Sequence, residues 1–254
     1  MLKTFSQFTF ILFIAFILKF LDTYYQIHTD TLSVEKYGIV SPVGVQIKIN
    51  GNYFDTVSKG KVCNGNDCDE AWIVIGEVNS GMAHMIRRTL EIMDSNALAP
   101  FCFISRGGDI DSSEKIIQLM QQHDATACLG ERYYIDEQVF SIGTIDIDGN
   151  QVIGTLCMSA CAYIYAGANH RVSYGKPLIG VHKIEFGSFY HWRYGTELDS
   201  YEESSFQQTL QKLHPSSSKR LTAIKQLSNK VDHNDIRFLT ANEIENLELV
   251  TEWR

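Results

Sequence analysis

The chain has 254 residues, 44% of them hydrophobic, which is enough to bury the core of one globular domain of about 200 residues. Its formal net charge of −8 leaves no basic stripe for phosphates, so nucleic acid is excluded as a partner. The four prolines are scattered and no Gly/Ser-rich run occurs, so we expect no flexible linker inside the domain.

The N-terminal segment 5–21 is an almost unbroken apolar run. Such a run is either the core of a signal peptide or a short membrane anchor. No small-x-small cleavage site follows it, and the pair Tyr24–Tyr25 suits a membrane–water interface. We therefore expect residues 1–24 to be an anchor rather than a cleaved signal. Lys3 precedes the run, which favours an N-terminus inside and a domain outside.

Residues 25–69 are predicted to form a juxtamembrane segment with short strands. The alternation of 43–51, ending in a turn at Asn50–Gly51, predicts a hairpin. Cys63 and Cys68 bracket a Gly/Asn/Asp turn, and in an exported domain they make the clearest local disulfide. The pairing of the remaining cysteines stays open: Cys102, Cys128, Cys157 and Cys161. Their spacings give weak support for zinc, so we expect no metal.

Strands and helices alternate from residue 70 onward. Buried strands are predicted where apolar residues run continuously, in 71–78, 100–105 and 125–130. Amphipathic helices are predicted in 81–94 and 113–123, the second capped by Asp111 or Ser112. This order predicts an α/β protein with largely parallel strand pairing.

The second half of the domain departs from this alternation. Residues 131–152 alternate with period two around Asp148–Gly149, which predicts an inserted β-hairpin. Two helices are expected between 202 and 230, with a break near Pro215. Thr240 and Glu243 have the spacing of a capping box, and a terminal strand is expected at 247–253.

The residues with chemical potential lie in 157–184. Ser159 stands among small residues at the start of an apolar helical segment, where free backbone N–H groups gather. His182 ends a short apolar strand farther along the chain. We interpret Ser159 as a nucleophile and His182 as its base. Lys183 would point to the opposite face of the strand, which disfavours a Ser–Lys mechanism.

These features together resemble a known family. The segments 105–111, 157–171, 179–184 and 235–250 are similar to the Clp-type serine peptidases within the crotonase-like superfamily. The similarity is closest to their membrane-anchored or periplasmic bacterial relatives, in which the serine lies between two cysteines, and it covers about residues 70–254.

The resemblance implies an α/β fold of the crotonase-like ββα spiral type, with an inserted β-hairpin and an N-terminal transmembrane helix. It implies a serine hydrolase, and specifically a peptidase acting on a peptide or protein substrate, without a metal or organic cofactor. The chain would lie in a bacterial inner membrane as a single-pass protein, with residues 70–254 facing the periplasm. Related domains assemble into rings, so the resemblance also raises the option of a homo-oligomer.

The family roles map onto individual residues of this sequence. Ser159 would be the nucleophile, His182 the general base and Asp235 the acid that orients it. Backbone N–H groups of Gly108 and Ala160 would form the oxyanion hole.

Two departures from the family pattern keep alternatives open. Arg106 stands where the family has proline, and Ile236 occupies the position of the family aspartate, which leaves Asp235 one residue early. A Ser–His dyad is therefore an alternative to a triad. A catalytically inactive domain that binds or scaffolds is the alternative function. An acyl-CoA enzyme of the crotonase type is less favoured, because an exported domain has no supply of coenzyme A.

Overall fold

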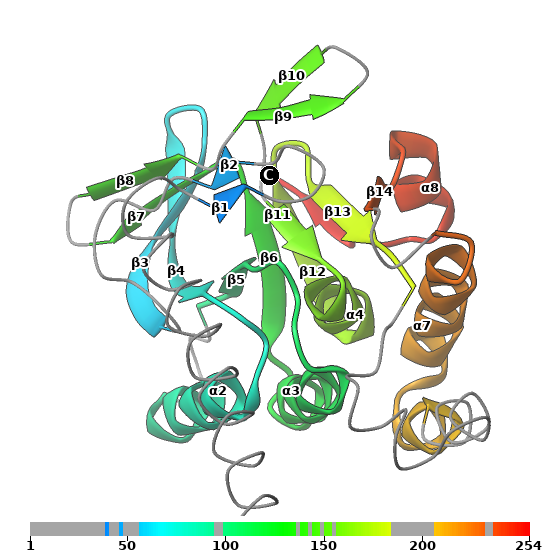
Figure 1. The fold of residues 1–254 in the computed structure, drawn as a ribbon. Coiled ribbons are helices and arrows are strands. Elements are labelled where there is room, and N and C mark those ends of the chain that lie inside the picture. Colours follow the sequence, from blue (N-terminus) through cyan, green and yellow to red (C-terminus); the bar gives the residue numbers. More distant parts are fainter. Residues whose placement is uncertain are drawn as a thin grey trace, which may run out of the picture.

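The computed structural model describes residues 39–40, 46–47, 56–93, 99–135, 138–141, 144–147, 150–153, 156–183, 206–231 and 236–254. Its centre is one large sheet with eight strands: β3 (Thr56–Asn64), β4 (Asp67–Ile75), β5 (Phe101–Ile104), β6 (Thr126–Gly130), β7 (Arg132–Ile135), β8 (Gln138–Ser141), β12 (His170–Tyr174) and β15 (Glu252–Trp253). Their order across the sheet is β15-β12-β6-β5-β4-β3-β7-β8 (Figure 1).

The large sheet has four parallel and three antiparallel strand pairings. Strands β15, β12, β6, β5 and β4 are joined by parallel pairing. Strands β3, β7 and β8 continue the sheet by antiparallel pairing. The predicted α/β architecture with parallel pairing is therefore confirmed for the part of the sheet from β15 to β4. Strand β3 adds a long strand from the segment before residue 70.

A smaller sheet carries the predicted nucleophile and base. It contains β11 (Leu156–Met158), β13 (Leu178–Val181) and β14 (Arg237–Phe238), with β13 in the middle. Strands β11 and β13 are parallel, whereas β14 is antiparallel to β13. The N–H of Met158 donates to Ser105 O (3.0 Å), so this sheet joins the large one just beyond the end of β5.

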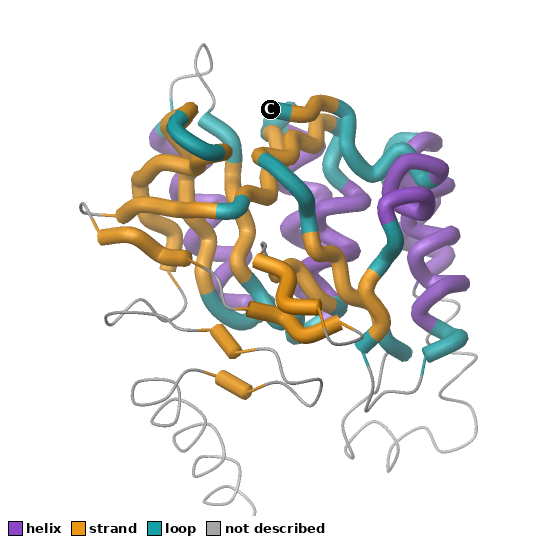
Figure 2. The backbone as a smooth tube through the Cα atoms, turned by 90° about the horizontal axis from the view of Figure 1, so that it is seen from above, coloured by secondary structure: helices purple, strands orange, loops and turns teal. Residues whose placement is uncertain are grey.

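Helices cover one face of the large sheet (Figures 1 and 2). The labelled helices are α2 (Ser80–Ile92), α3 (Ile110–Gln122), α4 (Ala160–Gly167), α7 (Pro215–Ser228) and α8 (Ala241–Asn246), and residues 206–212 are also helical. Strand β4 shows how the two faces separate: Val74 packs in the helix-side core with Met82 of α2, whereas Ile73 packs in a second core with Met158 and Leu178 of the small sheet. The large sheet is therefore a middle layer that is buried on both faces.

Most of the predicted elements are present. Strands β5 and β6, helix α2 and the helical pair around Pro215 lie close to their predicted positions, whereas β4 begins at Asp67 and ends at Ile75, a few residues before the predicted 71–78. The predicted capping box at Thr240 and Glu243 is confirmed, because each side chain bonds the backbone N–H of the other residue. The predicted disulfide between Cys63 and Cys68 is also confirmed.

Three details differ from the prediction. Helix α3 begins earlier than expected, because Asp109 rather than Asp111 or Ser112 is its N-cap and accepts from Ser112 N–H. The inserted hairpin is two hairpins, β7–β8 and β9 (Thr144–Ile147) paired with β10 (Asn150–Ile153). The predicted Asp148–Gly149 turn lies between β9 and β10, but these two residues are outside the described ranges.

The N-terminal predictions fall mainly on residues that the structure does not describe. Strand β1 (Ile39–Val40) pairs antiparallel with β2 (Gln46–Ile47), whereas the expected turn at Asn50–Gly51 is outside the described ranges. The apolar run 5–21 is likewise outside them. Among the residues that are described, no helix has the length and apolarity needed to cross a membrane.

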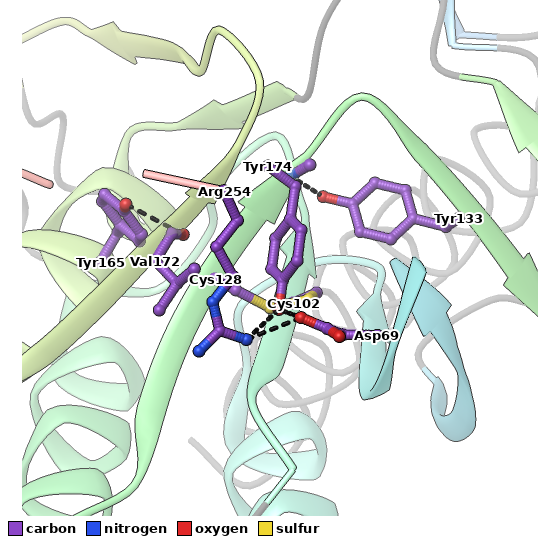
Figure 3. The surroundings of a disulfide bond; sticks show 9 residues. Asp69, Cys102, Cys128, Tyr133, Tyr165, Val172, Tyr174 and Arg254 are labelled. Carbon is purple, nitrogen blue, oxygen red and sulfur yellow. Dashed lines mark hydrogen bonds and ion pairs between the residues drawn. A yellow bond between two sulfur atoms is a disulfide. The ribbon is translucent and has the colours of Figure 1, made fainter. Parts of the chain in front are cut away.

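A polar cluster of Asp69, Tyr174 and Arg254 joins two interior strands of the large sheet to the last residue. Tyr174 Oη donates to Asp69 Oδ2 (2.7 Å), and Arg254 Nη1 contacts the same carboxylate oxygen (2.6 Å). Figure 3 shows this cluster beside the buried disulfide between Cys102 of β5 and Cys128 of β6. The hydrogen bonds from Tyr174 and Arg254 lower the pKa of Asp69. The cluster thereby ties β4 and β12 to the C-terminal residue.

Candidate active site

Ser159 occupies a strained turn between β11 and α4. Its backbone has φ 53° and ψ −123°, a region that a residue with a side chain rarely adopts and that costs about 1–3 kcal/mol. Its N–H donates to Gly180 O (2.9 Å) and its carbonyl accepts from Tyr163 N–H (3.3 Å), so strand and helix hold it from both sides. Although Ser159 is the N-cap residue of α4, its hydroxyl makes no capping bond. A strand–turn–helix with this geometry presents a serine hydroxyl for reaction.

Gly107, the neighbour of the predicted oxyanion donor Gly108, lies against this turn. A β-carbon added to Gly107 would lie 2.5 Å from Ser159 Cβ and 3.1 Å from Ala160 N. Gly107 has φ 108° and Gly108 has φ 138°, so both positions favour glycine. The backbone at Gly107 therefore lies so close to Ser159 that a side chain there would collide with it, whereas a side chain at Gly108 would collide with Val78.

The two glycines differ in how their N–H groups are used. Gly107 N–H donates to Ser105 Oγ (3.1 Å), so it is already bonded. Val78 forms a parallel bridge with Gly108 through the two neighbouring residues: Val78 N–H donates to Gly107 O (2.7 Å), and Asp109 N–H donates to Val78 O (2.7 Å). The N–H of Gly108 itself takes no part in this pairing with Val78. Gly108 is thus the better donor of the pair.

Ala160 supplies the second candidate donor. It is the first residue of α4, and the first N–H groups of a helix have no partner within the helix. They also lie at the positive end of the helix dipole, which favours a negative charge there. Ala160 is buried, and water competes poorly for a charge held beside it.

His182 follows β13 at the same edge of the small sheet. The parallel register pairs Met158 with Gly180, so Ser159 and His182 come directly after the adjacent ends of β11 and β13. His182 is partly buried, and its Nδ1 is shielded from solvent. The structure therefore brings the predicted base to the strand end next to the predicted nucleophile.

Asp235 lies outside the described residues, and its role stays a prediction. The described residues on either side of this gap both lie near His182. Lys183 N–H donates to Val231 O (3.2 Å) before the gap, and a β-carbon on Gly180 would lie 2.8 Å from Ile236 Cγ2 after it.

Carboxylates gather where α3 begins, directly after Gly108. Burial, followed by the negative charge of Asp109, raises the pKa of Asp111. Burial also raises the pKa of Glu114, against a hydrogen bond from Thr209 that lowers it. These shifts are consistent with a crowded acidic helix start. In the described part of the chain, no group of three or more His, Cys, Asp or Glu side chains could hold a metal ion.

Two features of the site were not found from the sequence. Ser105 braces the glycine turn through its Oγ, and only the bend of the chain after β5 reveals this. Cys157 and Cys161 form a disulfide across Ser159. Their spacing was visible, but several pairings of the four unassigned cysteines were open.

Comparison with known proteins finds similarity to solved structures and no match by sequence. No family model matches the sequence, and no curated protein matches it. A ClpP1 mutant from Listeria monocytogenes has a similar solved structure, with 15% sequence identity and a TM-score of 0.45 over 72% of this chain and 89% of that chain. The α/β architecture with a large sheet rests on the strand pairing described above.

Proposed function

We propose that the chain is a serine hydrolase that cleaves peptide bonds through Ser159. The observation that carries the proposal is the geometry of Ser159, a strained residue at a strand–helix turn whose hydroxyl does not cap its helix. The glycine turn at 107–108 packs against it, and His182 follows the adjacent strand. A plain structural serine needs none of these features.

In the proposed mechanism Ser159 Oγ attacks the carbonyl carbon of the substrate while His182 takes the hydroxyl proton. The N–H groups of Gly108 and Ala160 stabilise the oxyanion of the tetrahedral intermediate. His182 then gives the proton to the leaving amine, and the C–N bond breaks to leave an acyl-enzyme. Water, deprotonated by His182, hydrolyses the ester and regenerates Ser159.

Asp235 is the proposed acid that orients His182. The chain before and after the gap lies near the end of β13, through Val231 and Ile236. This position supports a carboxylate within reach of the imidazole. A Ser–His dyad remains the alternative if the residue at 235 does not influence the histidine.

The proposed setting is extracytoplasmic, with residues 1–24 as a membrane anchor and residues 70–254 in a bacterial periplasm. The apolar run at 5–21 supports the anchor. The disulfides support an oxidising compartment, because such bonds are rare in cytosolic proteins. A homo-oligomer is compatible with this arrangement.

A fluorophosphonate probe tests the proposal directly, because it phosphonylates only activated serines. We expect the folded full chain to be labelled, and tandem mass spectrometry to place the adduct on Ser159 in the tryptic peptide that ends at Arg171. Heat-denatured protein is the control and should not react. Absence of label on the folded protein would instead support the inactive binding or scaffolding domain, which the departures at Arg106 and Ile236 favour.

Replacing Gly107 with alanine should lower the labelling rate about 10²-fold, since the new Cβ would overlap Ser159 Cβ and displace the turn. Gly65 is a matched control. It also has a positive φ (61°), but a Cβ there meets nothing within 4 Å. Both variants place alanine at a positive φ, but only G107A also places its Cβ against Ser159. Equal labelling of G107A and G65A would show that the glycine turn does not shape the site.

A further inference from the structure

The Cys157–Cys161 disulfide, here called the serine bridge, encloses the candidate nucleophile. Cys157 lies in β11 and Cys161 in the first turn of α4, at a sequence separation of 4, with Ser159 midway between them. Their Cα atoms are 5.2 Å apart, and both side chains are fully buried in the helix-side core. The covalent ring thus contains the strand end, the strained serine and the start of the helix.

A strained backbone persists only where its surroundings fix it. Around Ser159, hydrogen bonds fix the two ends of the turn: Met158 N–H donates to Ser105 O (3.0 Å) on the strand side, and Tyr163 N–H bonds Ser159 O (3.3 Å) on the helix side. The serine bridge adds a covalent restraint between these two ends. Ala160, the candidate oxyanion donor, lies inside the same ring.

The small size of the ring closed by the serine bridge indicates that the bridge restrains the local turn more than it stabilises the whole fold. Cross-links that close long loops restrict the unfolded chain more than those that close short loops. The Cys102–Cys128 bridge has a sequence separation of 26, against 4 for the serine bridge. Both bridges are fully buried. The serine bridge is therefore the weaker of the two as a global stabiliser, and its restraint is concentrated on the turn at Ser159.

We propose that the serine bridge is a positioning element that holds Ser159 Oγ and the Ala160 N–H in reactive register. This inference rests on the proposed hydrolase function, in which both groups act on the same carbonyl. The bridge does not touch the substrate. It lowers the freedom of the strand–helix turn, so that the hydroxyl and the donor are already placed when the substrate binds.

Paired cysteine variants of the full chain test the proposal. C157A/C161A removes the serine bridge, and C102A/C128A removes the other buried bridge as a matched control. C157V/C161A is a second test variant that restores side-chain volume in the core, in case the alanine pair folds poorly. Each protein is reacted with a fluorophosphonate over a range of concentrations to separate kinact from KI, and its melting temperature is measured. Amide hydrogen exchange is followed for a peptide spanning 156–164.

Removal of the serine bridge should lower kinact about 10²-fold with KI changed less than about threefold, because displacement of reacting groups by about 1 Å costs this much in rate. Exchange in 156–164 should accelerate. The C102A/C128A control should keep kinact within about threefold of wild type even though its melting temperature falls further. A folded variant without the serine bridge that keeps wild-type kinact would overturn the proposal, whatever its exchange rate.

The hydrolase function and the positioning role of the serine bridge can be refuted separately. If wild-type Ser159 does not react, the hydrolase function fails, and the exchange measurement decides alone whether the bridge holds the turn. If wild-type Ser159 reacts and the bridge variants react equally fast, the function stands and the positioning role is refuted.

Discussion

Replacing Ser159 with alanine is expected to lower kcat about 10⁴–10⁶-fold on a p-nitrophenyl acyl ester, without unfolding the protein. Removing a serine nucleophile costs this much where serine and histidine act as a unit. Alanine leaves the core intact because the serine hydroxyl caps nothing in α4. The circular dichroism spectrum and the melting temperature should therefore stay near those of wild type. In a protein of this size, each kcal/mol lost from the free energy of unfolding lowers the melting temperature by about 2–4 °C.

His182→Ala should cost nearly as much as Ser159→Ala, and the double variant little more than either, because the two groups contribute to one step. The chain contains a matched control pair. His214 Nδ1 lies 2.8 Å from Ser216 Oγ at the exposed start of α7, so this is a hydrogen-bonded serine and histidine outside the candidate site. It lacks the strained turn and the adjacent glycines.

S216A and H214A should therefore hydrolyse the ester at the wild-type rate. Additive losses for Ser159 and His182, or comparable losses at 214 and 216, would contradict the assigned nucleophile and base. The acid is tested in the same assay. D235N should lower kcat by up to about 10⁴-fold if it orients the imidazole, whereas D232N should not. Equal rates for D235N and wild type would leave a Ser–His dyad.

The sequence predicts the parts of this fold that depend on local pattern. Continuous apolar runs located β4, β5 and β6, because a strand buried on both faces needs apolar residues at every position. The capping box of α8 was readable because both of its bonds lie within four residues. The start of α3 was misplaced, since Asp109, Asp111 and Ser112 are all good caps, and only the path of the chain after Gly108 selects Asp109.

Features that depend on distant parts of the chain could not be predicted. Disulfide pairing is one, since Cys102 and Cys128 meet only because β5 and β6 are neighbours in register. The positive φ of Ser159 is another, because a residue with a side chain enters that region only under tertiary restraint. The sequence therefore offers Ser159 as a candidate, whereas the strain that distinguishes it from an ordinary helix cap is visible only in the fold.

Helix α4, which begins after Ser159, is buried along its whole length, so the carbonyl groups at its far end need protein donors. Two buried arginines supply them. Arg220 donates to Ala166 O and Ala168 O. Arg171 is only 2% exposed and donates to the carbonyl oxygens of Ala168, Asn169, Glu248 and Leu249. Burial, followed by the like charge of Arg220, lowers the pKa of Arg171 to about 10, so it is still charged at neutral pH.

Arg171→Met is therefore expected to lower the free energy of unfolding by about 3–5 kcal/mol, because several buried carbonyls lose a charged donor at once. For a chain of this size the melting temperature should fall by roughly 6–20 °C. Arg132→Met is the matched control, since among the described residues Arg132 donates to one carbonyl, Gly65 O (2.8 Å), in an exposed bond. Its expected loss is below about 1 kcal/mol.

Urea denaturation of both variants measures their free energies of unfolding. The value for R171K should fall between those of R171M and wild type, because an ammonium group has three donors but lacks the planar fork of a guanidinium group. Equal stability of R171M and R132M would mean that the carbonyls at the end of α4 find other donors. The arginine acts at the opposite end of the helix from Ser159, so R171M that remains folded at 20 °C should still react with a fluorophosphonate at close to the wild-type rate. A loss of reaction in the folded variant would show instead that the far end of α4 controls the geometry of the serine turn.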